Sequence, residues 1–480
     1  MMVFSTLYVV WAIRLLCNLS TYIQLWYVKE YRFDRMAIHL RSNQGKRIWF
    51  PSFRRPPVTL KTACIFAGVV VVELAVYSFS PFSVPLRFLT MDILLFPLTA
   101  LFVAAFKAPT LLYHIWVIRR ARQLLRAHSA MRVVGITGSY GKTSTKEYLA
   151  SILGTKYETL KTEASKNSPI GISEVVLRKL HHAYDAFVVE MGAYKPGEIA
   201  EMCELVRPEI GILTAINPQH QDLFGSIEQT VKAKYELVSG LHGKKVVIVN
   251  YDNTYTRQMG ENAKKDGCTV IYYSVAKQTD WYATGIVQQE QGVKFTVRYG
   301  KQEHDVTVPL IGVFHVSNIL AAMAAAFQLG LLFDEVVKGC SAITSLPKTM
   351  QPVVTSLPAL CIDDTFNNNP DAAVAAISFL KEKKGKKILV FQPMIELGAY
   401  TSSSHEKVGE YAARVCDRVL LTNDSYLADF TRGMKKVHSK LEPMVVSHES
   451  AAAYLKTHTS AGDTVLFKGK ESGRVLALVR

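Results

Sequence analysis

The sequence predicts a mixed chain: N-terminal transmembrane helices, then an α/β central domain with a phosphate-binding loop (P-loop), then a C-terminal Rossmann-like α/β domain. Three observations support this. Long apolar runs occupy the first 116 residues, short β-rich runs alternate with helix-like segments from residue 131 onward, and a Gly-rich turn follows the first β-rich run. Such alternation favours a mostly parallel sheet covered by helices. We place the domains at residues 1–130, 131–345 and 346–480.

Three apolar runs, residues 3–28, 62–79 and 88–106, are each long enough, or nearly so, to cross about 30 Å of hydrocarbon. Basic segments lie at 29–61 and 119–132, and basic loops favour the cytoplasmic side of a membrane. We therefore expect a multi-pass protein of the cytoplasmic membrane, with its N-terminus outside and its α/β domains in the cytoplasm.

A charge at mid-bilayer is costly, and Arg14 lies in the first run, so that run could instead lie in the membrane interface, as could 107–116. The alternative for all three runs is a buried helical domain of a soluble protein.

The net charge of +16 is concentrated at the N-terminus, where residues 1–132 hold 17 Lys and Arg against 4 Asp and Glu. This distribution argues against a nucleic-acid partner, because the remaining 348 residues are nearly neutral. The seven Cys are scattered without a CxxC or Cys/His cluster, which predicts reduced thiols and no structural zinc.

The stretch 131–146 reads MRVVGITGSYGKTSTK, a short buried strand followed by a Gly-rich turn and a helix. Backbone N–H groups in such a turn bind phosphate oxygens, and the helix N-terminus adds positive potential. Lys142 can reach the outer phosphates and Thr143 can ligate Mg²⁺. The spacing differs from the common G-x-x-x-x-G-K-[ST] pattern, because Ile136 takes the first Gly position. We predict as nucleotide contacts Gly138, Ser139, Gly141, Lys142, Thr143 and Ser144.

Polar residues fall at or just after the ends of the predicted strands 132–137, 186–190, 210–215 and 245–250. They are Thr137, Glu190, Asn217 and Asn250. Ligands of parallel α/β sheets bind at the carboxyl ends of the strands, so this placement predicts one common site.

Several motifs, in order, resemble those of the Mur ligase family, the ATP-dependent amide ligases of peptidoglycan precursor synthesis. They are TGSYGKTST (137–145), KNSPIG (166–171), EMGA with GEI (190–193, 197–199), NPQH with FGS (217–220, 224–226), KAKYE (232–236) and DDTFNNNP (363–370). The last resembles the D-D-S-Y-N-A-N-P of the branch that adds D-Ala-D-Ala to a muramyl tripeptide. The resemblance covers about residues 131–480.

The resemblance implies a central ATPase domain that phosphorylates a carboxylate and lets an amine displace the phosphate. The implied catalytic residues are Lys142, Glu190, His220 and Lys234. Thr143 and Glu190 would hold one Mg²⁺, His220 and Glu190 a second metal, and Lys234 resembles the family's carbamylated lysine. Taken alone, Glu190 could be a helix cap, His220 an ordinary loop histidine and Lys234 a solvated helix residue.

The remaining implied contacts are Asn250 and Asn318 for adenine, Asp364 for ATP, and Asn167, Ser168, Asn367 and Asn369 for the substrates. Asn250 and Asn318 could instead be capping residues. Phe314 and His315 replace a His-Asn pair of the family, and Lys348 is the only basic residue where the family has Gly-Arg. K-G-S-R has become KGKE at 468–471, for which an exposed loop is the alternative.

The family's N-terminal domain, which holds the UDP-sugar of the substrate, has no counterpart here, and the apolar runs occupy its place. We therefore expect either a membrane-associated carboxylate substrate, such as a lipid-linked muramyl peptide, or a small-molecule muramyl peptide and a tether that holds the enzyme beside such a membrane assembly. The amine would be an amino acid or a dipeptide. The alternatives are a poly-γ-glutamate or folate ligase and a catalytically inactive membrane scaffold.

Overall fold

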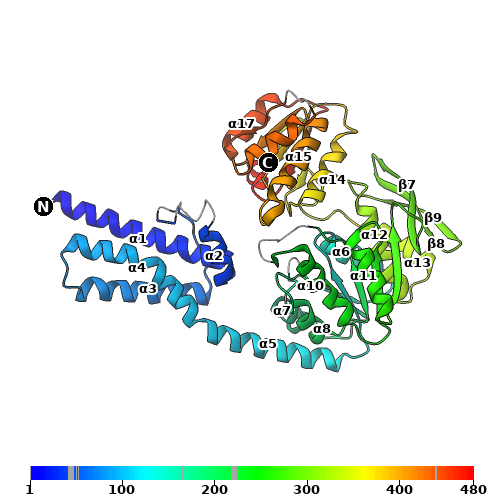
Figure 1. Cartoon of the computed structure of the whole chain (residues 1–480), viewed down its shortest axis with the longest axis horizontal. Helices are drawn as coiled ribbons and strands as arrows, with labels where there is room; N and C mark the ends of the chain where they lie inside the picture. The colour runs from blue at the N-terminus through cyan, green and yellow to red at the C-terminus, as the bar shows by residue number, and fades with distance from the viewer. Residues whose placement is uncertain are drawn as a thin grey trace. The chain divides into compact units, whose positions relative to one another are not determined.

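The computed structural model describes residues 2–41, 48–49, 51, 53–163, 166–217, 224–437 and 441–480. The chain forms two compact units, Met1–Val117 and Ile118–Arg480. The first is helical and the second contains two α/β domains (Figure 1). The boundary between the units falls inside helix α5 (Lys107–Ala127), between Val117 and Ile118.

The N-terminal unit is built from α1 (Met2–Val28), α2 (Phe33–Arg41), α3 (Leu60–Phe79), α4 (Val84–Ala105) and the start of α5. Each predicted apolar run is thus helical. By length and composition, three segments could cross a membrane: Thr6–Val28, Leu60–Phe79 and Val84–Ala127. Large apolar side chains such as Leu74, Phe79 and Leu101 remain exposed on the outer faces of these helices, as expected of helices that are apolar all round.

Arg14 does not stay unpaired in this unit. Its guanidinium lies 3.0 Å from the Asp92 carboxylate on α4, and the Trp11 indole also donates to Asp92, at 3.1 Å. The charge that weakened the case for a first crossing is therefore matched by an opposite charge, which lowers the cost of placing both in an apolar environment.

The central domain is a nine-stranded sheet in the order β2-β3-β1-β4-β5-β6-β7-β8-β9. Neighbours are parallel from β2 to β7, and β7, β8 and β9 continue as an antiparallel meander. The strands are β1 (Arg132–Thr137), β2 (Thr159–Lys161), β3 (Ala186–Glu190), β4 (Ile210–Leu213), β5 (Val246–Asn250), β6 (Thr269–Ser274), β7 (Trp281–Gln289), β8 (Gly292–Tyr299) and β9 (Gln302–Val308).

Helices cover both faces of this sheet, and a separate apolar core lies on each face (Figure 1). One core contains α6 (Lys142–Leu153), α12 (His315–Gln328) and α13 (Phe333–Gly339), and the short η2 (Cys340–Ala342) follows. The other contains the end of α5, α7 (Pro169–Lys179), α8 (Glu198–Val206), α10 (Ile227–Ser239) and α11 (Thr254–Lys265). The predicted parallel sheet is confirmed, whereas the meander was not predicted.

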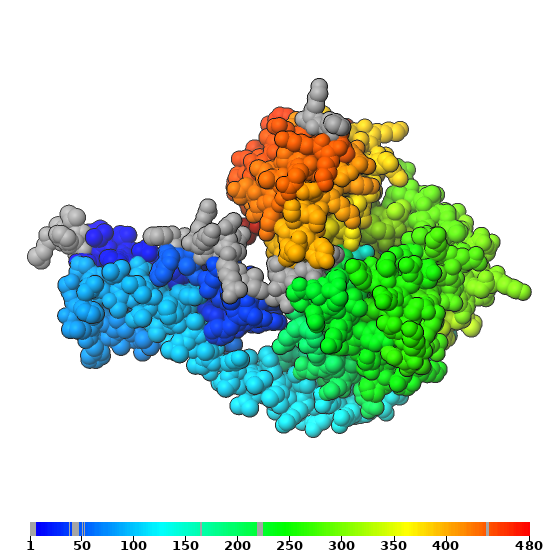
Figure 2. All heavy atoms as spheres, viewed as in Figure 1, coloured from blue at the N-terminus to red at the C-terminus, as the bar shows by residue number. Residues whose placement is uncertain are grey.

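The C-terminal domain has a six-stranded sheet in the order β10-β11-β15-β12-β13-β14, parallel except for β10. Its strands are β10 (Gln351–Val353), β11 (Leu360–Asp364), β12 (Lys387–Phe391), β13 (Arg418–Leu421), β14 (Met444–Val445) and β15 (Thr464–Lys468). Its helices are α14 (Pro370–Leu380), η3 (Gly398–Tyr400), α15 (Thr401–Val415), α16 (Leu427–Lys435), α17 (His448–His458) and α18 (Ser472–Val479). The space-filling view shows this domain and the central domain from one face (Figure 2).

The strands predicted at 359–363 and 418–422 each differ by one residue from β11 and β13, and β12 has the predicted bounds. The one-residue shift of β11 matters, because it puts Asp364 at the carboxyl end of a strand, where α/β sheets hold their functional side chains.

Candidate active site

The phosphate loop connects β1 to α6 and depends on two glycines. Gly138 has φ +153° and Gly141 has φ +82°. A Cβ on Gly138 would lie 2.0 Å from Thr214 Oγ1, and one on Gly141 would lie 2.5 Å from Asn318 Oδ1. Any larger residue would therefore clash and close the concave loop, which explains the Gly-rich spacing read from the sequence.

Lys142, the first residue of α6, holds its ammonium inside this loop. Nζ donates to the carbonyl oxygens of Gly138 (2.7 Å) and Ser139 (3.1 Å). Within the described part of the chain no carboxylate forms an ion pair with Lys142. The surrounding protein lowers the pKa of the ammonium, and the nearby Glu190 carboxylate acts in the opposite direction. The loop thus carries a positive charge that is only solvated by backbone oxygens.

Glu190 ends β3 and is hydrogen-bonded to Thr143, with which it was predicted to share Mg²⁺, and to Asn167, a predicted substrate contact. Its carboxylate accepts from Thr143 Oγ1 at 2.9 Å and from Asn167 Nδ2 at 3.0 Å, and buried Lys146 lies 3.7 Å away. The hydroxyl of Thr143 and the carboxylate of Glu190 are oxygen ligands of the kind that Mg²⁺ prefers, so the pair fits the predicted metal. Glu190 is buried, which excludes the alternative of a solvated helix cap.

His220, a predicted ligand of the second metal, lies outside the described residues. Among the residues with described positions, no group of three or more His, Cys, Asp or Glu forms a metal cluster.

Lys234 on α10 is 4% exposed, which rules out a solvated helix face. Burial, and secondarily the Lys142 charge, lower its pKa well below the ordinary value. Two residues later, Glu236 accepts the N–H groups of Gly197 (2.6 Å) and Ala200 (3.0 Å) at the start of α8. Sequence reasoning missed this role of Glu236, although its place in the segment that resembles the family's A-K-x-E was a usable signal.

Two cavities meet at the phosphate loop, and both are lined by Ser139 and Lys142. The larger, about 350 Å³, also holds the predicted contacts Gly141, Thr143, Ser144, Asn250, Asn318, Asp364, Asn367 and Asn369. The smaller, about 50 Å³, is lined by the predicted Gly138, Asn167 and Lys234, and by Gly192, Ala193, Tyr194, Phe224 and Thr230. The larger cavity thus brings together every predicted nucleotide contact except Gly138, and it also holds the predicted substrate contacts Asn367 and Asn369. Of the predicted substrate contacts, only Asn167 lines the smaller cavity.

Several predicted polar residues have a local structural role as well. Ser168 lines neither cavity and instead caps α7 by accepting from the Gly171 N–H at 3.3 Å. Asn369 caps α14 by accepting from the Ala372 N–H at 3.0 Å. Asn250 Oδ1 accepts from the Asp252 N–H at 3.0 Å, so this residue both caps a turn and lines the larger cavity.

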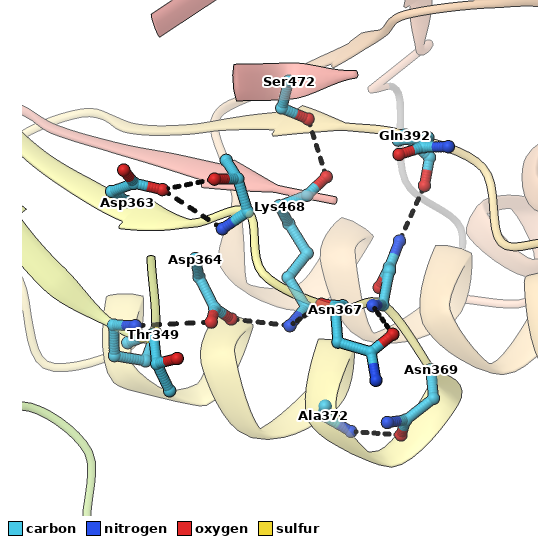
Figure 3. A network of polar contacts seen from close by, with 12 residues as sticks. Thr349, Asp363, Asp364, Asn367, Asn369, Ala372, Gln392, Lys468 and Ser472 are labelled. Atoms are coloured by element: carbon cyan, nitrogen blue, oxygen red, sulfur yellow. Dashed lines mark hydrogen bonds and ion pairs between the residues drawn. The ribbon is translucent and has the colours of Figure 1, made fainter. Parts of the chain in front are cut away.

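The C-terminal wall of the larger cavity is a closed polar network (Figure 3). Lys468 Nζ donates to Asp364 Oδ2 at 2.6 Å and to the Asn367 carbonyl at 3.0 Å, and its side chain is 2% exposed. The alternative of an exposed loop at 468–470 is therefore wrong for Lys468, which ends β15. Lys348 does not line either cavity, although its neighbour Thr349 lines the larger one.

The two positions where the family's His-Asn pair is replaced have different surroundings. Phe314 lines the larger cavity. His315 is buried and its Nδ1 lies 2.8 Å from the Tyr148 hydroxyl, beneath the phosphate-loop helix. Burial lowers the pKa of His315 to about 4, so the ring is neutral near pH 7. The residues that line the larger cavity and that sequence reasoning missed include Thr214, Asp252, Ser317 and Asp371.

Comparison with known proteins gives matches to two family models, the Mur ligase middle domain at residues 136–326 and the Mur ligase, glutamate ligase domain at residues 350–471. Among curated relatives, the UDP-N-acetylmuramoyl-tripeptide–D-alanyl-D-alanine ligase of Escherichia coli K12 is 36% identical over 62% of this chain and 65% of its own length. The enzyme of the same name from Bacillus subtilis 168 is 31% identical over 73% of this chain and 75% of its own length. The chain thus spans just under two thirds of the E. coli relative.

Solved structures agree. MurF from Acinetobacter baumannii superposes with a TM-score of 0.69 at 26% identity, covering 76% of this chain and 79% of that one. MurF ligase from Thermotoga maritima in complex with ADP gives 0.67 at 25% identity, covering 76% and 83%. The motifs, the two α/β domains and these matches lead to one conclusion, that the chain belongs to the Mur ligase family.

Proposed function

We propose that this chain is an ATP-dependent ligase that joins the carboxylate of a muramyl peptide to D-Ala-D-Ala or a similar amine, through an acyl phosphate. The observation that carries the proposal is the meeting of the two cavities at Lys142. A nucleotide in the larger cavity and a carboxylate in the smaller one would face each other across an ammonium that has no carboxylate partner among the described residues. The names of the relatives, and the ADP in the T. maritima structure, supply the substrate classes.

The reaction consists of two displacements. The substrate carboxylate oxygen attacks the γ-phosphorus of ATP and ADP leaves, and then the amine nitrogen attacks the acyl carbon while phosphate leaves and the nitrogen loses a proton. Phosphoryl transfer depends chiefly on positioning and on neutralising charge. Lys142 would neutralise the transferred phosphoryl oxygens, and Asn167 would orient Glu190. Mg²⁺, held by Thr143 and Glu190, would add charge neutralisation at those oxygens.

We also propose that Lys234 is carbamylated, as the resemblance of its segment to that of the family implies. Carbamylation forms a bond between a neutral amine nitrogen and the carbon of CO₂ and releases one proton. The lowered pKa of Lys234 supports this, because it increases the neutral fraction of the amine. Bicarbonate-free enzyme should lose activity and regain it on addition of bicarbonate, and labelled bicarbonate should give a carbamate signal that Lys234→Gln lacks. Full activity without bicarbonate would refute this point.

We further propose that the N-terminal unit anchors the enzyme as a multi-pass protein of the cytoplasmic membrane, with its α/β domains in the cytoplasm and a lipid-linked muramyl peptide as the carboxylate substrate. Three helices long enough to cross support this. So does the first half of α5, where the exposed Tyr113 and Trp116 precede Arg119 and Arg120, since aromatic and basic residues are typical of the cytoplasmic membrane boundary.

The test uses the full chain in nanodiscs with Mg-ATP. Phosphate release and product are measured with UDP-linked and with lipid-linked muramyl tripeptide, each with D-Ala-D-Ala, D-Ala or glutamate as the amine. We expect ligation of D-Ala-D-Ala that requires all three substrates and is lost in Lys142→Ala. Lys264→Ala, which changes an exposed lysine away from both cavities, is the matched control and should keep full activity.

The alternatives predict different results. Preference for glutamate over D-Ala-D-Ala would indicate a poly-γ-glutamate or folate type of ligase. Equal, negligible turnover in the wild type and in Lys142→Ala would indicate an inactive scaffold. Full efficiency with the UDP-linked substrate alone would retain the ligase but refute the lipid-linked substrate.

A further inference from the structure

Asn217, four residues after the end of β4 at Leu213, is hydrogen-bonded through its backbone to the phosphate loop. Its N–H donates to Ser139 Oγ at 3.2 Å, and the same hydroxyl donates to the Asn217 carbonyl at 3.2 Å. Asn217 is 3% exposed. Because two hydrogen bonds fix its backbone to Ser139, any shift of the loop around a nucleotide must move Asn217 as well.

The side chain of Asn217 reaches the other domain. Nδ2 donates to Asn369 Oδ1 at 3.1 Å and to Asp371 Oδ2 at 3.1 Å. Both acceptors belong to the first turn of α14 and its cap, and both line the larger cavity. The amide orientation is fixed by chemistry, since a carboxylate and a capping oxygen can only accept here, so both amide hydrogens are used across the domain boundary.

We propose that Asn217 is a positioning residue that couples the phosphate loop to the start of α14. Nucleotide binding in the loop thereby aligns the C-terminal wall of the cavity, which carries Asn367 and the Asp364–Lys468 pair. Asn217 touches neither substrate nor nucleotide in this role; it acts through Ser139 on one side and through Asn369 and Asp371 on the other. The effect on turnover rests on the proposed ligase function, whereas the coupling itself rests only on nucleotide binding.

The geometry explains why an amide is needed. Asn217→Asp keeps the size of the side chain but replaces its two donors by a carboxylate facing Asp371 and Asn369 Oδ1, so it converts two attractions into repulsions. Adding Asp371→Asn restores a donor and an acceptor with their places exchanged. The double variant should therefore recover part of the coupling, which a merely structural defect at position 217 would not do.

The first readout is hydrogen exchange of the α14 first-turn amides, with and without Mg-ADP. In the wild type Mg-ADP should slow exchange there at least about tenfold, because a hydrogen bond to a charged group contributes enough for a factor of about 10 to 100. Asn217→Asp should lose this response while still binding Mg-ADP within about threefold of wild type. The double variant should regain a clear part of it. This readout does not need ligase activity.

The second readout is steady-state kinetics. Asn217→Asp should lower kcat about 10- to 100-fold with KM for ATP changed less than about threefold. Two controls isolate the contact. Asn253→Asp makes the same exchange at the cap of α11, where Nδ2 donates to the Ile216 carbonyl and Oδ1 accepts from the Thr256 N–H. Lys407→Ala removes the lysine that forms an ion pair with Asp371. Each should stay within about twofold of wild type, because Asp caps as well as Asn and exposed ion pairs contribute little.

An α14 response to Mg-ADP that is the same in wild type and Asn217→Asp would overturn the inference, as would a double variant no better than the single one. If Asn217→Asp unfolds below the assay temperature, Asp371→Ala is tested in its place. That change removes one acceptor at a half-exposed position and should at least halve the exchange response, and an unchanged response would refute the coupling. A wild type that binds Mg-ADP and shows the response but ligates nothing would refute the proposed function alone.

Discussion

The carboxyl ends of the two sheets hold charge in opposite ways. At the central sheet, Lys142 and Lys234 line the smaller cavity together and neither is ion-paired to a carboxylate among the described residues. At the C-terminal sheet, Lys468 is matched by Asp364 at 2.6 Å and both are buried. A buried cation without a counter-ion is costly, so the central edge has the charge that would favour an anion, whereas at the C-terminal edge the two charges compensate each other.

The largest expected effect is that of replacing Lys142, whose ammonium has no carboxylate partner among the described residues. Lys142→Met should reduce ATP-dependent phosphate release about 10³-fold, because a positioned cation stabilises the charge of the transferring phosphoryl group. The melting temperature should not fall, since the variant removes a desolvated cation that is hydrogen-bonded to the carbonyl oxygens of Gly138 and Ser139. A melting temperature clearly below that of the wild type would contradict the contrast between the two sheet edges.

For the Lys468–Asp364 ion pair we expect the reverse, a loss of stability when one partner is replaced. Lys468→Met leaves the Asp364 carboxylate buried without its cation and should lower the free energy of unfolding of the C-terminal domain by about 3 to 5 kcal/mol. Asp364→Asn combined with Lys468→Met removes both charges and should recover most of that loss in urea titrations. If the double variant were as unstable as the single one, the pair would not be the source of the stability.

Beneath the phosphate loop, a neutral buried group should make stability depend on pH. The pKa of His315 is about 4 in the folded state, below the ordinary value of about 6.5 for unfolded chains. Between these values the unfolded state binds more protons, so stability rises with pH across this window and is lost as pH falls, by about 3 kcal/mol at pH 4. His315→Gln should remove this component from the slope of unfolding free energy against pH, and an unchanged slope would reject the assignment.

The smallest effect concerns Glu236, a carboxylate whose oxygens already accept hydrogen bonds from the protein backbone. Glu236 accepts two N–H groups at the start of α8, so Glu236→Gln should cost about 1 kcal/mol of stability. It should leave kcat nearly unchanged, which separates it from Lys234 two residues earlier. A loss of turnover comparable with that of Lys142→Met would instead give Glu236 a role in the site.

The sequence predicted what depends on contiguous residues. The bounds of β1 and β3 and the loop between Gly138 and Thr143 follow from a buried run, a Gly-rich turn and a helix in direct succession. The meander of β7 to β9 was missed, because its strands are half-exposed and their pairing depends on one another. The capping roles of Ser168 and Asn369 were readable, since each precedes a Pro at the first helical position, but they were read as substrate contacts.

By itself, the sequence determined the phosphate loop, the order of the motifs and hence the family, because backbone geometry in a tight turn depends on the residues of that turn. Only the tertiary structure decided which charged side chains form ion pairs and which remain without one among the described residues. Asp364 meets Lys468 across 104 residues, and Asn217 meets Asn369 across 152. Burial decides whether a Lys such as 142, 234 or 468 is solvated, paired or left for a ligand, and burial is a property of the packed sheets rather than of any local pattern.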